Sequence, residues 1–121
     1  MADEIKLSVQ LSLTKGSLKD NFNPGQISLD QTNQGLLSTV VSVGTSEEDL
    51  SVGDISTLGI LVLQNLGTNF VEYGPKSGGS MVAYGKIEPG EVAVLRLKPG
   101  ITHRWVADTA AVKVLVKLLE D

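Results

Sequence analysis

The first part of the chain alternates between apolar and polar residues. Ile5, Leu7, Val9, Leu11 and Leu13 occupy every second position, with Lys, Ser and Gln between them. A period of two is typical of a β-strand that buries one side. The pattern therefore predicts a strand over residues 5–13.

Short apolar runs continue along the chain, and each is bounded by Gly, Pro or Asn in a turn-like sequence. Such runs predict further strands. They cover residues 26–30, 36–43, 58–66, 70–73, 80–87, 91–97 and 101–107. Residues 58–63 are apolar on both faces, which indicates a central strand or a strand at a subunit contact.

Two Pro-Gly pairs, at residues 89–90 and 99–100, lie ten positions apart. In such a turn Pro fixes φ at the first corner, and Gly supplies a positive φ at the second. The spacing predicts two consecutive hairpins, and hence an antiparallel meander or part of a Greek key, in the second half of the chain.

The C-terminal segment, residues 109–120, allows two interpretations. Its Ala and Leu residues have good helical propensity. Val112, Val114 and Val116 alternate with Lys113, Leu115 and Lys117, and β-branched residues at this spacing favour a strand. We expect a strand here, and a surface loop with acidic residues over positions 45–57.

Eight or nine short strands in 121 residues predict an all-β fold, an antiparallel β-sandwich of the jelly-roll type. The length suits one domain spanning residues 1–121. Residues 1–4 precede the first strand without a packing signal, so we expect a flexible N-terminal arm there.

Composition narrows the function. Fourteen acidic residues against ten basic ones give a formal charge of −4, which argues against nucleic acid as a partner. The absence of cysteine excludes disulfides and thiolate metal sites. No basic leader precedes an apolar run at the N-terminus, and no run approaches the ~20 apolar residues that span a bilayer, so we expect no membrane partner.

His103 is the single histidine, and the Pro99-Gly100 turn before it is similar to part of the cupin metal-binding pattern. A cupin site needs two or three imidazoles, and this chain supplies one. We therefore expect no metal and no cofactor. The competing interpretation places His103 beside Ile101 and Trp105, at the edge of the core or at an interface.

Catalytic arrangements find little support. No Gly-Xaa-Ser-Xaa-Gly motif accompanies His103, and the acidic pairs at 47–49, 88 and 91, and 120–121 fall in or beside turns or at the terminus. The segment Gly74–Ser80 contains Lys-Ser but lacks the order of a phosphate-binding loop. We expect a protein that is not an enzyme.

Three aromatic residues, Tyr73, Tyr84 and Trp105, fall in predicted strands. If neighbouring strands align them on the surface, they could form a platform for carbohydrate. Packing in the core and at an interface is the alternative, and we favour it.

Three blocks in the second half resemble a group of small tailed-bacteriophage virion proteins. They are Asn-Leu-Xaa-Xaa-Xaa-Phe-Val-Glu-Xaa-Gly at 65–74, Pro-Gly-Glu at 89–91, and Ala-Asp-Thr-Ala-Ala-Val at 107–112. The resemblance covers residues 58–121. It implies a jelly-roll β-sandwich that is part of the virion, without enzymatic activity.

The resemblance further implies a capsid decoration (cement) subunit, made in the host cytoplasm and located on the capsid surface, with the major capsid protein as partner. A tail- or fibre-associated module that binds carbohydrate is the alternative. The two-sided apolar strand and the Val-rich tail favour a homo-oligomer, and we expect a trimer. The candidate interface residues are Ala2, Asp3, Glu4, Leu61, Leu63, Tyr73, Tyr84, His103 and Trp105.

Overall fold

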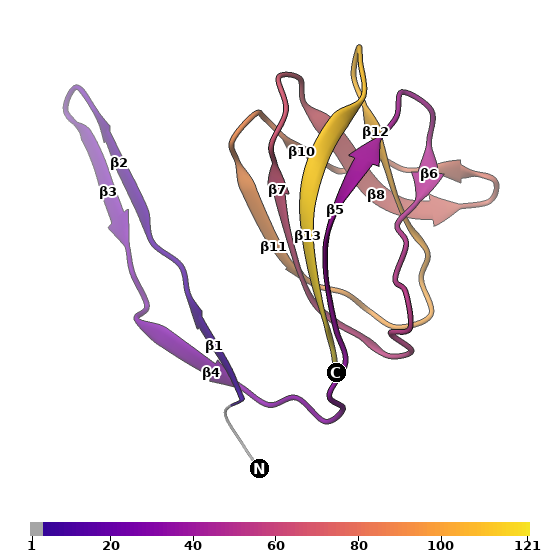
Figure 1. The fold of residues 1–121 in the computed structure, drawn as a ribbon. Helices are drawn as coiled ribbons and strands as arrows, with labels where there is room; N and C mark the ends of the chain where they lie inside the picture. The colour runs from indigo at the N-terminus through magenta and orange to yellow at the C-terminus, as the bar shows by residue number, and fades with distance from the viewer. Residues whose placement is uncertain (1–3) are drawn as a thin grey trace. The chain divides into compact units, whose positions relative to one another are not determined.

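The computed structural model describes residues 4–121, and every regular element in that range is a β-strand (Figure 1). The all-β prediction is confirmed. Contacts divide the chain into two compact units, Met1–Thr32 and Asn33–Asp121. The single domain predicted over residues 1–121 stays a prediction.

The first unit is a long hairpin, called the ribbon below, whose two arms pair along two successive segments. Strand β1 (Ile5–Ser8) pairs with β4 (Gln26–Leu29), and β2 (Leu11–Lys15) pairs with β3 (Leu18–Phe22), all antiparallel. Gly16, at φ 59°, opens the two-residue turn at the tip. Between the two paired segments, residues 9–10 lie opposite the three residues Asn23–Gly25. The register therefore shifts by one residue at this point.

The second unit contains two antiparallel sheets that share one buried cluster, arranged like a sandwich. The first sheet has the order β11-β7-β13-β5, and the second has the order β10-β8-β12-β6, with β9 paired to β8. The bounds are β5 Leu36–Val43, β6 Glu48–Asp49, β7 Leu58–Asn65, β8 Val71–Ser77, β9 Ser80–Met81, β10 Gly85–Ile87, β11 Val92–Arg96, β12 His103–Ala107 and β13 Val112–Glu120.

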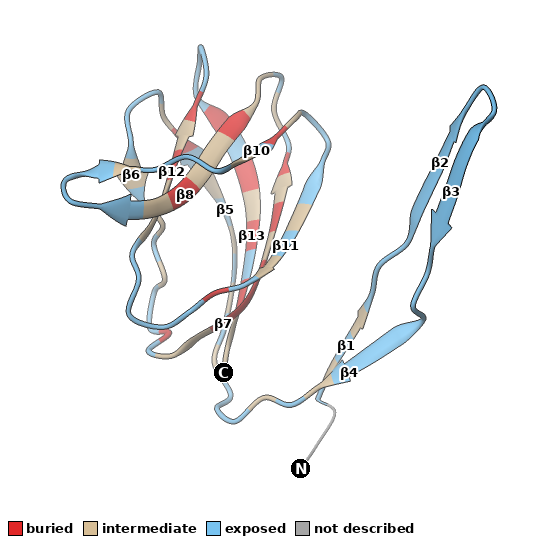
Figure 2. Ribbon diagram, turned by 180° about the vertical axis from the view of Figure 1, so that it is seen from behind, coloured by how far each residue is buried: buried red, intermediate tan, exposed pale blue. Residues whose placement is uncertain are grey.

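Alternation along β13 explains its place at the centre of the first sheet. Val112, Val114, Val116 and Leu118 are buried, while Lys113 and Lys117 are exposed on the other side. Strands β5 and β7 flank β13 and turn their own alternate residues to the same core. Buried positions mark β7, β13 and β8 in Figure 2, whereas the ribbon of the first unit is exposed or partly exposed throughout.

The Pro-Gly turns do not form hairpins, and that prediction is wrong. Gly90 and Gly100 have the expected positive φ, 84° and 88°. However, β10 pairs with β8, β11 with β7, and β12 with β8 and β6. Each turn therefore carries the chain from one sheet to the other. Turn residues determine the local backbone conformation, but they do not determine which strand the next segment pairs with.

Most strands that follow one another in the sequence of the second unit lie in different sheets, as they do in a fold made of two Greek keys. The jelly-roll assignment remains a prediction, which this order supports. The tail is a strand, β13, as expected, and the loop predicted at 45–57 contains only the short strand β6.

Candidate functional site: an apolar groove beside His103

An apolar groove opens on the second unit between the segment after β9 and the connection from β11 to β12. We call it the Tyr84 groove, and its volume is about 390 Å³. The residues that line it are Pro75, Val82, Tyr84, Leu95, Arg96, Leu97, Lys98, Ile101 and His103. Tyr84 is 69% exposed and Val82 is 55% exposed, so apolar side chains reach solvent here rather than the core.

Tyr84 is held by a second tyrosine. The rings of Tyr73 and Tyr84 pack edge to face, with centroids 5.7 Å apart and planes at 88°. Tyr73 in turn lies over Gly85, where any side chain would overlap its ring. Partial burial, with Tyr84 nearby, raises the pKa of the Tyr73 phenol above its ordinary value.

His103, which lines the groove, and Trp105 on the same strand each carry a buried side-chain nitrogen. Among residues 4–121, Nε2 of His103 and Nε1 of Trp105 are buried without a hydrogen-bond partner. Removal of His103 from water lowers the pKa of its imidazole. A neutral imidazole beside apolar side chains suits packing at the edge of the core.

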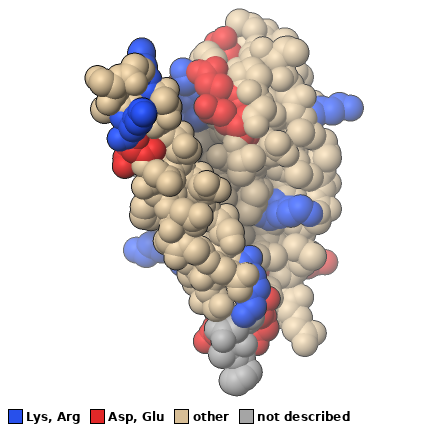
Figure 3. All heavy atoms as spheres, turned by 90° about the vertical axis from the view of Figure 1, so that its left-hand side faces the viewer, with Lys and Arg blue, Asp and Glu red and all other residues tan. Residues whose placement is uncertain are grey.

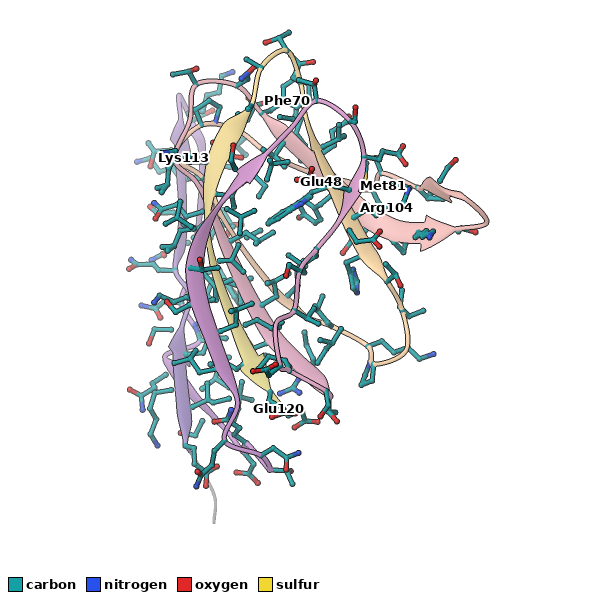
Figure 4. The ribbon with its side chains drawn as sticks, turned by 45° about the vertical axis from the view of Figure 1, so that its right-hand side comes forward. Glu48, Phe70, Met81, Arg104, Lys113 and Glu120 are labelled. Atoms are coloured by element: carbon teal, nitrogen blue, oxygen red, sulfur yellow. The ribbon has the colours of Figure 1, made fainter. Side chains whose placement is uncertain are left out.

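Arg104 points to the opposite side of β12 from Trp105. Its Nε donates to Oδ1 of Asp49 at 2.8 Å, and its Nη1 lies 3.3 Å from Oε1 of Glu47. The same Glu47 oxygen accepts a hydrogen bond from the backbone N–H of Met81 at 2.8 Å. Figure 4 shows Met81 and Arg104 in the same part of the second unit. The hydrogen bond to Asp49 is the main cause that raises the pKa of Arg104. These contacts fasten β6 and the β9 segment to β12.

The acidic residues considered for catalysis have structural contacts. Glu91 Oε1 accepts from the backbone N–H of Glu88 within the turn, at 2.8 Å. Glu120 Oε2 accepts from the backbone N–H and the hydroxyl of Ser56, at 3.0 and 2.6 Å. Within the described range, no three side chains of the His, Asp and Glu types gather closely enough to hold a metal ion.

The structure separates the predicted interface residues into distinct groups. Ala2 and Asp3 lie outside the described residues, and Glu4 is exposed and accepts a hydrogen bond from the backbone N–H of Gln31 at 2.9 Å. Tyr73, Tyr84 and His103 gather at or beside the groove.

Leu61, Leu63 and Trp105 lie in the core, each 2% exposed. Their alternate positions along β7 and β12 point between the two sheets. The sequence predicted these three residues as interface candidates, but side chains buried to this degree offer no surface to a partner. The burial of Trp105 also removes it from the carbohydrate platform, which leaves Tyr84 as the exposed aromatic of the three.

The ribbon of the first unit was missed as a surface. Leu11, Leu18 and Phe22 are 55%, 59% and 54% exposed. The cross-strand partners Leu11 and Phe22, and likewise Leu7 and Ile27, lie on one side of their strand pairs. Gly16, directly after the alternating run at residues 5–13, was the signal that could have revealed this hairpin.

No protein-family model matches the chain, and no curated protein matches it. Among solved structures, a protein described under "Bacillus endospore appendages form a novel family of disulfide-linked pili" is similar. The two are 17% identical with a TM-score of 0.47, over 74% of this chain and 88% of that one. A likeness of this degree carries no argument about function. Across residues 4–121 no helix has the length and apolar character needed to cross a membrane.

Proposed function

We propose that this chain is a non-enzymatic structural subunit of a tailed-phage virion. Specifically, it is a capsid decoration subunit that binds the major capsid protein on the outer shell. The observation that carries the proposal is the Tyr84 groove, where apolar side chains are exposed to solvent and are not part of the buried core. Exposed apolar residues around a concave surface are typical of protein-binding sites.

The resemblance to small virion proteins supports the same function. Its blocks at 65–74 and 89–91 lie in the strands and turns that build the second unit, and Gly74, which ends the first block, packs directly against the backbone of Val82. The first block therefore also shapes the groove, through the contact of Gly74 with Val82.

Stabilisation of the shell follows from binding across the joints between capsomers. A subunit that binds the closed shell and not the open one stabilises the closed state in proportion to its occupancy. We propose that the subunit acts as a homo-oligomer, with a trimer as the expected state, so that several weak contacts combine.

The test is reconstitution on capsids that lack the chain. Purified protein is titrated onto these capsids, and the bound copies are measured after sedimentation together with the temperature at which the shells open. Saturable binding and a raised opening temperature are expected. Absence of binding at saturating protein overturns the decoration function.

Two matched variants test the groove. Val82→Asp places a charge on the rim of the groove, whereas Leu66→Asp changes a side chain of similar exposure, 52%, that does not line it. Val82→Asp should weaken capsid binding roughly tenfold or more, because an unpaired charge would have to lose water at the contact. Leu66→Asp should bind as the unaltered protein does, and equal binding of all three contradicts the assignment of the groove.

A further inference from the structure

The ribbon of the first unit has an apolar side that lacks a covering layer of its own. Each of the two sheets in this unit has only two strands, and an isolated two-stranded hairpin is marginally stable at best in water. Leu11, Leu13 and Phe22 are between 41% and 55% exposed, although they alternate as core residues do. Such a ribbon needs a partner surface.

A second apolar surface lies on the same chain, on the outer side of the sheet β11-β7-β13-β5, and it is exposed along the edge strands β11 and β5. Alternate residues of these strands face away from the core. Val40, Val92 and Val94 are 50%, 55% and 37% exposed, and the pairing places Val94 beside Val62. We call this surface the outer sheet face. In Figure 3, which colours all uncharged residues alike, the Lys, Arg, Asp and Glu side chains form separate groups on one face of the molecule.

Charge distinguishes the two surfaces. The outer sheet face carries Lys113, Lys117 and Arg96, and Lys113 lies on the opposite side of β13 from Glu48 and Arg104 (Figure 4). On the ribbon, Asp20 is paired with Leu13 and so shares its apolar side, with Lys15 at the tip. Lys15, which pairs with Leu18, shares this side, and Arg96 lies 4.0 Å from Asp121. The complementary charges are therefore Asp20 on the ribbon and Lys113 and Lys117 on the outer sheet face.

From these two surfaces we infer that the ribbon of one copy packs on the outer sheet face of a second copy of this chain. The inference rests on the homo-oligomer of the proposed function and is independent of capsid binding. Both complementary surfaces belong to one chain, so copies that exchange ribbons cover both without any other protein.

The area of the ribbon supports exchange over ribbon-to-ribbon packing. At ~3.3 Å per residue over residues 5–15 and ~10 Å for two paired strands, one side of the ribbon presents roughly 350 Å². One contact therefore buries about 700 Å² in total, below the roughly 1,200 Å² at which specific interfaces begin. Two copies that each give and receive a ribbon bury about 1,400 Å², which falls within the range of stable interfaces. The inferred contact therefore favours a dimer over the trimer that the sequence suggested.

Neighbouring positions on β2 provide a matched test. Leu11 belongs to the apolar side and Ser12 to the other side, and both are exposed. Light scattering on the full-length protein should give an oligomer for the unaltered chain and for Ser12→Asp, and a monomer for Leu11→Asp and for Val94→Asp. An oligomer of Leu11→Asp overturns the inference, as does a monomer of the unaltered protein at tens of micromolar. An oligomer of Val94→Asp shows that ribbons contact one another instead.

Cross-linking identifies the contact directly, since the chain has no native cysteine. Leu13→Cys protein is mixed with Val94→Cys protein and treated with a flexible bismaleimide, and mass spectrometry identifies the joined peptides. A link between the two different variants is expected, while Ser12→Cys should link to Val94→Cys at least tenfold less.

If the oligomer persists and no ribbon-to-sheet link forms, the inference is overturned while the proposed function stands. A chain carrying both cysteines that links only within itself also overturns it. Failure of capsid binding with the link intact overturns only the decoration function.

Discussion

The side-chain amide of Asn65 donates a 2.9 Å hydrogen bond to the carbonyl oxygen of Ile87, and so joins the end of β7 in one sheet to β10 in the other. The same amide donates to the carbonyl of Asn69 at 2.8 Å, and its oxygen accepts from the backbone N–H of Gly67 at 2.8 Å. Asn65 is 1% exposed, so water cannot reach its side chain, and these bonds supply the hydrogen-bond partners that water would otherwise provide.

Asn65→Ala should lower the free energy of unfolding by about 3 kcal/mol, because it leaves two carbonyls and one N–H without their partner. Urea unfolding followed by circular dichroism measures the change. Asn33→Ala is the control, since the Asn33 amide makes one exposed bond, to the carbonyl of Asp121, and should cost less than about 1 kcal/mol. Equal effects of the two substitutions contradict this account of Asn65.

Gly74 and Gly79 form a matched pair of glycines. A Cβ at Gly74 would overlap the carbonyl oxygen of Val82, whereas a Cβ at Gly79 meets nothing within 4 Å. Gly74→Ala should cost about 2 kcal/mol or more, because the strand must move away from Val82, and it should also weaken binding at the Tyr84 groove. Gly79→Ala should change stability by less than about 0.5 kcal/mol. Thermal unfolding of both variants checks this difference.

The sequence predicted most strands of the second unit because their apolar residues alternate and their ends carry turn residues. Strand β5 over Leu36–Val43 matches the prediction in both bounds. Strand β3 was missed because Lys19, Asp20 and Asn21 lie between its apolar residues, and such residues have low strand propensity.

Pairing and exposure could not be derived from the same pattern. Alternation shows that a strand has an apolar side but not which neighbour covers it, so the apolar positions of the ribbon were assigned to the sandwich. Similarly, Tyr84 and Trp105 both fall in apolar segments, and only the arrangement of the sheets leaves Tyr84 at 69% exposure and Trp105 at 2%. The Tyr84 groove depends on this difference.

Acid should weaken the hydrogen bonds that join Glu120 of β13 to Ser56 and Thr57, the residues before β7. Hydrogen bonds from the Ser56 hydroxyl and N–H, and from the Thr57 N–H, hold the pKa of Glu120 below its usual value of 4.5. Because the folded pKa is lowered, the stabilisation is complete above the unfolded pKa and is lost as the pH falls through the folded one. Glu120→Gln should therefore lose less stability between pH 5 and about 3 than the unaltered protein. Urea unfolding across this pH range measures the difference, and parallel curves contradict it.

His103 should cause a second, separate loss of stability in weak acid. Burial lowers the pKa of its imidazole below the ordinary 6.5, so the unfolded chain binds a proton more readily than the folded chain does. Stability is therefore complete above about pH 6.5 and declines as the pH falls from there toward the folded pKa. His103 is the single histidine, so no other side chain has its ordinary pKa between about 5 and 7. His103→Gln should flatten the curve of unfolding free energy between pH 7 and pH 5, while Glu120→Gln should leave that interval unchanged. An unaltered protein whose stability rises from pH 7 to pH 5 contradicts a buried neutral imidazole at this position.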